Sequence, residues 1–202
     1  MVGIIDYGVG NLFSLEASFR RIGEDATVSS EIEVLNTCDR LVLPGVGAFE
    51  DAAKKLRESG LGDYLKAQAA VGKPILGICL GMQLLFERSF EYGDHPGLGL
   101  LAGSVIPMAG VIPTELKIPH MGWNKLTFTK DSRLFTHISE GDFVYFVHSY
   151  FATDCESSVS SVAEYGKKLT ASVEKDNIFG CQFHPEKSGS VGLNILKAFC
   201  EV

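Results

Sequence analysis

The sequence carries little positive charge, and it has no run of apolar residues long enough to span a bilayer. Its 18 Lys and Arg residues are outnumbered by 25 Asp and Glu residues, so the formal net charge is −7 at pH 7. The sequence therefore lacks the excess of basic residues that binds nucleic acid or an anionic membrane surface. Repeats, linkers and low-complexity tracts are also lacking, and we therefore expect residues 1–202 to form a single domain.

Cysteines are few and far apart. There are five, and no two of them form a Cys-x-x-Cys pair. Such spacing argues against a zinc site and against a disulfide framework, and scattered thiols are typical of a reducing compartment. The first residues enter an apolar run directly, without the basic segment and long apolar region of a secretory signal. We expect a cytoplasmic protein with no bound metal.

A dinucleotide-binding motif is incomplete in this chain. Gly8-Val9-Gly10 begins like the fingerprint of such a site, but Phe13 stands where its third glycine would be. Two glycines alone are a weak signal, so we expect no nucleotide cofactor, and nothing else in the sequence indicates one.

Short apolar runs alternate with amphipathic stretches as far as residue 90. The runs predict buried strands, and the stretches between them predict helices with one apolar face. The predicted strands are Val2–Ile5, Leu41–Leu43 and Ile75–Ile78, and the predicted helices are Leu12–Ile22, a segment containing Ala52, Ala53 and Leu56, and Leu61–Val71. This alternation indicates an α/β fold whose mostly parallel central sheet has helices on both faces.

From Pro96 onward, glycine and proline recur and apolar residues alternate loosely. This pattern predicts a small antiparallel β portion in the second half of the chain. Short strands are expected within Leu98–Met108, at Phe143–Val147, Ser161–Tyr165, Thr170–Val173 and Ile178–Phe183, followed by a helix over Val191–Phe199.

Cys79 stands where a predicted strand meets a predicted helix. Gly77 and Gly81 bracket it as two glycines bracket the nucleophile in a strand-to-helix elbow, and Met82–Arg88 is amphipathic. A helix N-terminus beside the sulfur would lower the thiol pKa and favour the thiolate. A single cysteine is more often a small buried hydrophobe, but this glycine frame favours Cys79 as a nucleophile.

The tetrapeptide Phe183-His184-Pro185-Glu186 closes the last predicted strand. Pro185 ends ladder pairing there and stiffens the corner. A histidine with a carboxylate two residues later matches the base and orienting acid of triad chemistry. Taken alone, His184 could equally be a solvated side chain near a surface acid. Together with Cys79, the pattern favours a Cys79–His184–Glu186 triad.

Acyl transfer also needs donors for an oxyanion. The backbone N–H of Leu80, directly after the nucleophile, is the first candidate. The second is the N–H of Val46, because the glycines on either side of it allow that peptide to point inward. An ordinary strand-to-helix loop would explain the same spacing.

Two segments together resemble the class I, triad-type glutamine amidotransferases. They are Gly77-Ile78-Cys79-Leu80-Gly81-Met82-Gln83 and Gln182-Phe183-His184-Pro185-Glu186. Further segments, spread over nearly the whole chain, are similar to those of the glutaminase subunits of imidazole glycerol phosphate synthase. These are Asp6-Tyr7-Gly8-Val9-Gly10-Asn11-Leu12, Pro44-Gly45-Val46-Gly47-Ala48-Phe49, Pro119-His120-Met121-Gly122-Trp123-Asn124, Phe146-Val147-His148-Ser149-Tyr150 and Pro185-Glu186-Lys187-Ser188.

The resemblance implies that Cys79 attacks the side-chain amide of glutamine and that His184 hands a proton to the departing ammonia. The positions that match the family's glutamine-binding residues are Gly47, Gln83, Ser149 and Tyr150. Edge-strand packing is the alternative explanation for Ser149 and Tyr150. The segment Ser89–Pro96 is less distinctive, so the resemblance assigns no role to Glu91. The ammonia would pass to a cyclase partner subunit, which uses it to make imidazole glycerol phosphate and AICAR in histidine biosynthesis.

The resemblance also implies an interface with that cyclase at Trp123, with His120 and Lys187 in the same contact. A half-buried core ring is the alternative for Trp123.

Two other functions are compatible with the same residues. One is a sister amidotransferase, for anthranilate, pyridoxal phosphate or GMP synthesis, or a γ-glutamyl hydrolase. The other is a regulatory module that keeps the fold without catalysis.

Overall fold

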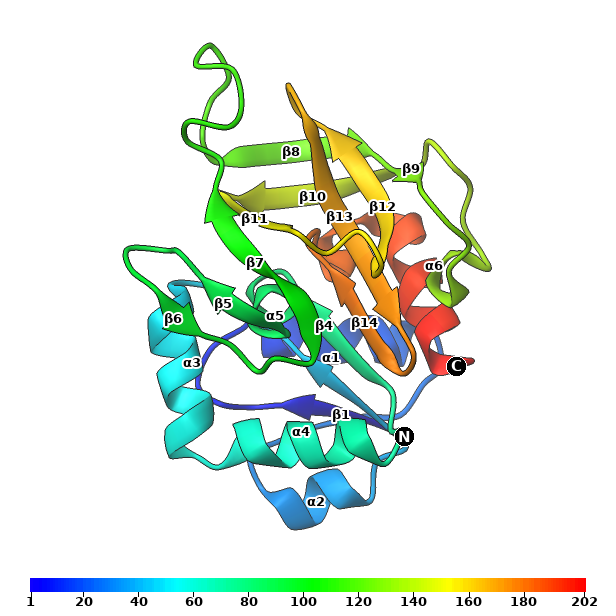
Figure 1. Ribbon diagram of the computed structural model, residues 1–202. Coiled ribbons are helices and arrows are strands. Elements are labelled where there is room, and N and C mark those ends of the chain that lie inside the picture. The colour runs from blue at the N-terminus through cyan, green and yellow to red at the C-terminus, as the bar shows by residue number, and fades with distance from the viewer.

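The computed structural model describes all 202 residues. Its central element is an eight-stranded sheet in the order β2-β1-β3-β4-β14-β13-β12-β9 (Figure 1). The first five strands in this order are parallel: β2 (Ala26–Ser29), β1 (Val2–Ile5), β3 (Arg40–Leu43), β4 (Ile75–Ile78) and β14 (Ile178–Cys181). The remaining three extend the sheet in antiparallel fashion: β13 (Lys168–Lys175), β12 (Val159–Glu164) and β9 (Thr127–Phe128).

Two smaller sheets are built from strands between residues 86 and 153. The four-stranded sheet has the order β11 (Tyr150–Thr153), β7 (Leu101–Pro107), β5 (Phe86–Ser89) and β6 (His95–Pro96). An antiparallel ribbon, which we call the β8–β10 ribbon, joins β8 (His120–Lys125) to β10 (Phe143–His148). The prediction of a mostly parallel sheet followed by a smaller antiparallel portion is confirmed.

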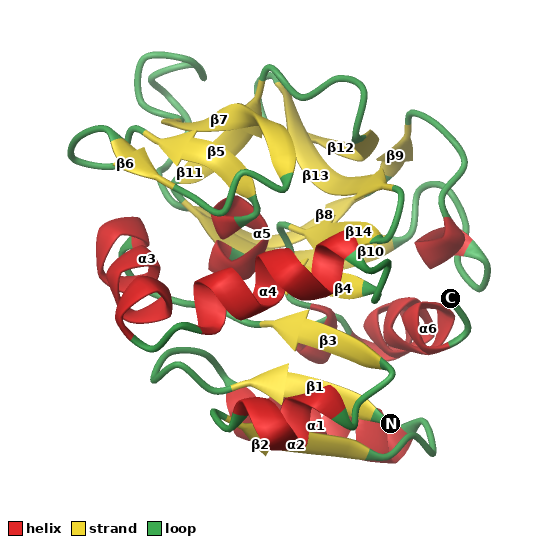
Figure 2. Cartoon of the chain, turned by 60° about the horizontal axis from the view of Figure 1, so that its bottom comes forward, coloured by secondary structure: helices red, strands yellow, loops and turns green.

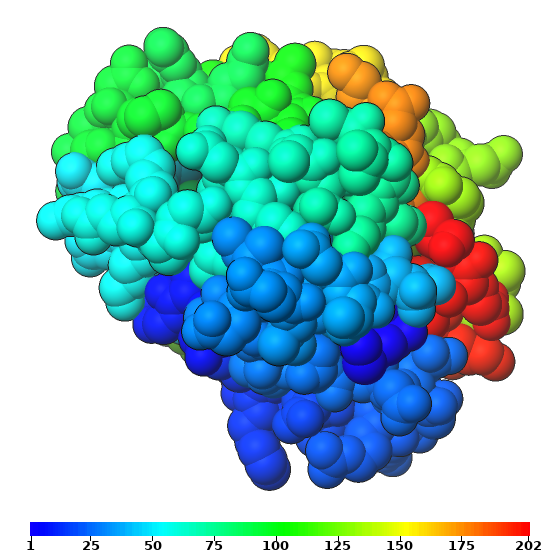
Figure 3. All heavy atoms as spheres, turned by 90° about the horizontal axis from the view of Figure 1, so that it is seen from below, coloured from blue at the N-terminus to red at the C-terminus, as the bar shows by residue number.

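Helices cover both faces of the parallel strands, because successive residues of each buried strand point to opposite faces. On β3, Leu41 and Leu43 pack in one hydrophobic cluster and Val42 in the other. The first cluster includes residues of α2 (Ile32–Asn36), α3 (Phe49–Glu58) and α4 (Leu61–Ala70), and the second includes those of α1 (Leu12–Arg21) and α6 (Gly189–Cys200). Figure 2 shows the helices on the two sides of these strands, and Figure 3 shows α2 to α4 as a continuous blue-to-turquoise face.

The predicted strands and helices are confirmed with small shifts at their ends, apart from one segment. We expected a helix over Met82–Arg88, but α5 covers only Leu80–Leu84, and β5 begins at Phe86. Leu84, Leu85 and Phe86 are all fully buried, so this stretch has no polar face to turn toward water. Its backbone instead joins the small sheet, where Phe86 pairs with Leu101 of β7.

No helix is long and apolar enough to cross a membrane. The structure also contains no group of three or more His, Cys, Asp or Glu side chains arranged to hold a metal ion.

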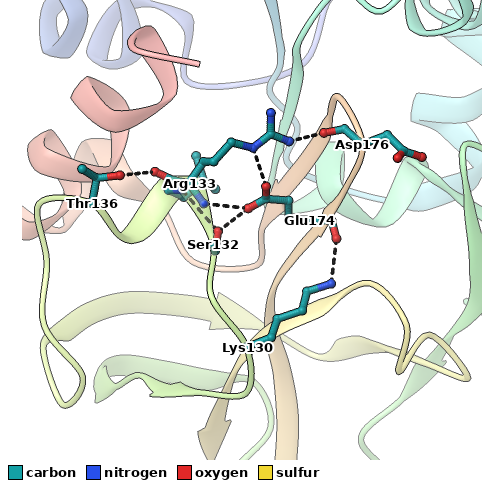
Figure 4. Close-up of polar contacts among 7 residues, drawn as sticks. Lys130, Ser132, Arg133, Thr136, Glu174 and Asp176 are labelled. Carbon is teal, nitrogen blue, oxygen red and sulfur yellow. Dashed lines mark hydrogen bonds and ion pairs between the residues drawn. The ribbon is translucent and has the colours of Figure 1, made fainter.

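A polar cluster fastens the loop after β9 onto the turn between β13 and β14 (Figure 4). The carboxylate of Glu174 accepts hydrogen bonds from the Ser132 hydroxyl at 2.5 Å, the Arg133 backbone N–H at 2.9 Å and Arg133 Nε at 2.6 Å. The Arg133 guanidinium also donates to the Asp176 carbonyl and lies 4.6 Å from the centroid of the Phe179 ring. Because β14 leads directly to His184, this cluster helps to hold the strand that carries the histidine.

We expect Glu174→Gln to lower the free energy of unfolding by about 2 kcal/mol, because the mostly covered carboxylate accepts three hydrogen bonds, and hydrogen bonds to charged acceptors are the stronger ones. Urea unfolding measures this loss. Glu164→Gln on neighbouring β12 is the matched control, since the Glu164 side chain is exposed and makes no ion pair. Equal stability losses in the two variants would contradict the role given to the cluster.

Candidate active site

Cys79 is the first residue after β4 and lies at the N-terminal end of α5. Its backbone has φ 55° and ψ −112°, a conformation that non-glycine residues rarely adopt. Backbone strain of this kind is typical of functional turns and requires firm support from the surrounding structure. The predicted strand-to-helix elbow is therefore present, although the helix after it is short.

The two positions on either side of Cys79 must be glycine because there is no room for a side chain. A β-carbon on Gly81 would lie 1.8 Å from the carbonyl oxygen of Leu43, and one on Gly77 would lie 2.7 Å from the backbone of Gly81. Both separations are far below van der Waals contact, so a side chain at Gly81 would push the start of α5 away from β3, and one at Gly77 would push it away from β4. The end of β3 thus lies directly against the turn that carries Cys79.

The loop after β3 lies against the same turn. A β-carbon on Gly45 would lie 2.8 Å from the backbone nitrogen of Gly81. The Tyr7 hydroxyl donates a 2.7 Å hydrogen bond to the carbonyl of buried Pro44 and fixes the start of the loop. Burial raises the pKa of Tyr7 well above its ordinary value, and the neighbouring Cys79 adds to that shift, so the phenol remains a donor.

Beyond Pro44 the loop becomes exposed. Val46 is 43% exposed, and Gly47 has φ 95°, which glycine adopts easily. The predicted second oxyanion donor therefore lies in the exposed middle of a loop whose two ends, Pro44 and Phe49, are buried.

His184 follows β14, and a 3₁₀ turn over Pro185–Lys187 begins immediately after it. Its Nδ1–H donates to Glu186 Oε1 at 2.9 Å, and both side chains are 3% exposed. The backbone of His184 is fixed by a 2.9 Å hydrogen bond to the Tyr145 carbonyl and by a 2.6 Å hydrogen bond from the Ser188 hydroxyl. The predicted stiff corner is confirmed. The other ring nitrogen of His184, Nε2, has no hydrogen-bond partner.

The neighbours of His184 favour its protonated form. Burial by itself would lower the pKa of the imidazole, but Cys79 and the Glu186 carboxylate outweigh it and raise the pKa from 6.5 to about 9. The imidazole therefore keeps a proton available at neutral pH, beside the sulfur of Cys79.

The predicted catalytic and binding residues meet at one cavity of about 310 Å³. Its lining includes Cys79, His184, both candidate oxyanion residues and all four candidate glutamine-binding residues, namely Val46, Leu80, Gly47, Gln83, Ser149 and Tyr150. Glu186 lies behind His184 and does not line the cavity. Parallel strands bring this about, since β3, β4 and β14 all end at the same edge of the sheet.

Four further residues at this site, Gln182, Val147, His148 and Pro119, were not predicted from the sequence. Gln182 donates to Cys79 Sγ at 3.8 Å and accepts from Gln83 Nε2 at 3.0 Å. Val147, His148 and Pro119 line the cavity. The alternating apolar residues of β10 were the available signal, because they place His148 on the same buried face as Val144 and Phe146.

Glu91 supplies the only carboxylate in the cavity lining. Its Oε2 accepts the backbone N–H of Phe49 at 2.8 Å, at the start of α3. Partial burial raises the pKa of the carboxyl group.

The three predicted interface residues do not share one surface. Trp123 is 55% exposed, and its ring meets Tyr145, over which the exposed Lys187 ammonium lies 5.9 Å from the centroid. His120 is only 3% exposed and stacks between Phe146 and Tyr165. The expectation of a surface role for His120 is wrong, because residues 120 and 123 of one strand point to opposite faces.

Comparisons with known proteins show which family the chain resembles. The family profile described as "Glutamine amidotransferase class-I" matches residues 4–201. A protein of Caldanaerobacter subterraneus subsp. tengcongensis, named "Imidazole glycerol phosphate synthase subunit HisH", is 49% identical over 100% of this chain and 98% of its own. The protein of that name from Lactococcus lactis subsp. lactis is 50% identical over 98% of this chain and 96% of its own.

Solved structures share the fold at lower identity. A crystal structure of a glutamine amidotransferase superposes with a TM-score of 0.77 at 20% identity, covering 99% of this chain and 97% of its own. PurLQS from Thermotoga maritima gives a TM-score of 0.75 at 20% identity over the same shares. The chain belongs to the class I glutamine amidotransferase family. Its close relatives place it, within that family, among the HisH subunits of imidazole glycerol phosphate synthase.

The raised pKa of His184 predicts how stability depends on pH. A group whose folded pKa is about 9 and whose ordinary value is 6.5 stabilises the folded state below pH 6.5, and this contribution is lost as the pH rises through about 9. The difference in unfolding free energy between the native chain and a His184→Asn variant should therefore shrink over that range.

Urea unfolding at several pH values between about 6 and 10 measures the difference. In a Cys79→Ala background the decline should be smaller and should end at lower pH, because Cys79 contributes to the raised folded-state pKa. A difference that stays constant over this range would contradict the assignment.

Proposed function

We propose that this chain hydrolyses L-glutamine to glutamate and ammonia with a Cys79–His184–Glu186 triad, as the glutaminase subunit of imidazole glycerol phosphate synthase. The observation that carries the proposal is the single cavity lined by the strained Cys79, by His184 and by the residues that match the family's glutamine site. Glu186 holds His184 from behind, so the other ring nitrogen faces the reaction.

The reaction begins when the sulfur of Cys79 attacks the side-chain carbonyl of glutamine. The Leu80 and Val46 backbone N–H groups hold the negative charge that develops on the carbonyl oxygen. The imidazolium of His184 gives its proton to the departing ammonia, for which a pKa of about 9 is well suited. Water then cleaves the γ-glutamyl thioester on Cys79, with His184 as the base.

The far end of the substrate requires groups that bind an α-amino and an α-carboxylate group. The Glu91 carboxylate is the only anionic group in the lining, and we assign it to the α-amino group. Gly47, Gln83, Ser149 and Tyr150 surround the remainder of the glutamine. Tyr150 is the first residue of β11, an edge strand, and it also lines the cavity. Edge-strand packing and contact with glutamine are therefore compatible at this position.

A cyclase subunit is the partner that receives the ammonia. In water near neutral pH, ammonia is mostly protonated and no longer nucleophilic, whereas a dry passage keeps it reactive. Exposed Trp123, with Lys187 close to the adjoining Tyr145 ring, offers the aromatic anchor and charge that such a contact uses. Five free thiols suit the cytoplasm, where we place the protein.

We expect Cys79→Ala to lower glutamine-dependent synthesis by the complex by about a thousandfold or more, because no other group replaces the nucleophile. Synthesis from ammonium salts by the cyclase should continue unchanged. Coupled assays with each nitrogen source measure the two reactions.

Cys200→Ala is the matched control, since Cys200 lies at the end of α6, away from the cavity lining, and burial raises its pKa to about 12. The control should keep full glutamine-dependent activity. Full glutamine turnover by the Cys79→Ala variant would show that the mechanism is wrong. Activation by an anthranilate or GMP synthase partner in place of the cyclase would instead indicate a sister amidotransferase.

The exposed Val46 loop predicts gated activity. We expect the isolated chain to hydrolyse glutamine slowly and to accelerate roughly 5- to 150-fold when the cyclase binds its phosphoribulosyl substrate, the range of ordinary coupling free energies. Glutamate release measures both states. Full activity of the isolated chain would count against gating and would leave the triad intact.

A further inference from the structure

Two buried histidines lie side by side on the inner face of the β8–β10 ribbon. His120 and His148 are directly opposite each other in its register, and they are 3% and 6% exposed. His120 Nδ1 lies 3.1 Å from His148 Nε2. The mechanism described above uses neither of these side chains, although His148 lines the glutamine cavity.

The hydrogen bonds determine which nitrogen of each ring carries a proton. His148 Nδ1 lies 2.8 Å from the Tyr150 carbonyl, which only accepts, so the proton is on Nδ1. Burial lowers the pKa of His148 to about 3, so the ring is neutral and its Nε2 must accept. The donor to that Nε2 is therefore His120 Nδ1–H.

The chain of hydrogen bonds continues from His120 outward along β8. Burial also lowers the pKa of His120, so its Nε2 is an acceptor. Asn124 Nδ2 lies 3.3 Å from it and gives its other hydrogen to the Glu164 carbonyl at 2.8 Å. Asn124, His120 and His148 thus form a chain in which every proton position is fixed.

The chain ends at the Tyr150 carbonyl, which has an unusual need for donors. Tyr150 and Pro107 lie opposite each other in a pair that exchanges no backbone hydrogen bonds, because the adjacent bond runs from the Met108 N–H to the Ser149 carbonyl. The Tyr150 carbonyl therefore points to the free edge of β11, where no strand offers a donor. Side chains donate instead: His148 from one side and Gln83 Nε2, at 3.2 Å, from the other. Gln83 also donates to Gln182, which in turn donates to Cys79. The carbonyl therefore joins the inner face of the ribbon to the nucleophile.

We propose that His120 is a positioning residue for glutamine binding: through its hydrogen bond to His148 it holds the Tyr150 carbonyl, and with it the Ser149–Tyr150 wall of the cavity. This proposal rests on the proposed glutaminase function. Without the His120 donor, the buried Nε2 of His148 has no partner, and the imidazole is free to turn away from Tyr150. His184 is not part of this chain of donors, and Cys79 is reached only at its far end, through Gln83 and Gln182, so the effect falls on substrate binding.

Two variants of His120 separate hydrogen bonding from packing. His120→Phe keeps an aromatic ring between Phe146 and Tyr165 but has no donor. His120→Asn loses the stacking but places an amide N–H near the position of Nδ1. We expect His120→Phe to raise KM for glutamine about five- to tenfold, as the loss of one buried hydrogen bond would, with kcat of the cyclase complex changed less than about twofold. His120→Asn should keep KM near the native value despite a lower melting temperature.

A KM that rises with loss of stability in both variants, or an unchanged KM in His120→Phe, would overturn the proposal. Nitrogen-15 spectra of the histidine rings in the native chain provide a readout that needs no activity. They should show His148 and His120 both protonated at Nδ1, and protonation of His148 at Nε2 would overturn the proposal as well. Absence of glutamine hydrolysis in the native complex would refute the glutaminase function and leave this spectroscopic result unaffected.

Discussion

The structure depends on a backbone contact that leaves no room for side chains. At the ends of β3 and β4, the loop after Leu43 and the turn around Cys79 pack directly on each other, with glycine at 45, 77 and 81. This close approach holds Cys79 at positive φ, and it brings the Leu80 peptide next to the Val46 loop. The nucleophile and both candidate oxyanion donors therefore belong to one close contact between neighbouring strands, with Val46 in its exposed part.

Strand direction and strand alternation arrange the remainder of the site. The parallel strands β4 and β14 are in register up to Ile78 and Cys181, so the residues that follow them emerge side by side. On the β8–β10 ribbon, alternation sends Trp123 outward and His120 inward. One face of this ribbon is thus available to a partner, while the other face supplies hydrogen bonds to the wall of the glutamine cavity.

The cavity contains two histidines with opposite electrostatic environments. His184 has a carboxylate and a sulfur as neighbours, and these keep it protonated even though it is buried. His148 has a backbone carbonyl and another neutral imidazole as neighbours, so burial dominates and keeps it neutral. The first is suited to proton transfer and the second to holding a fixed hydrogen-bond direction, although both border the same space.

Much of the fold and the triad could be predicted from the sequence, because both depend on local signals. Apolar periodicity predicted the strands and helices, and the glycines around Cys79 and the proline after His184 marked the two functional corners. The sequence could not show that Phe86–Ser89 joins a sheet, that His120 is buried, or that the Tyr150 carbonyl lies on the free edge of β11. These features depend on pairing partners far away in the chain. The type of each residue, given by the sequence, determines which groups it can bind. Only the tertiary structure decides which groups lie close enough to be bound.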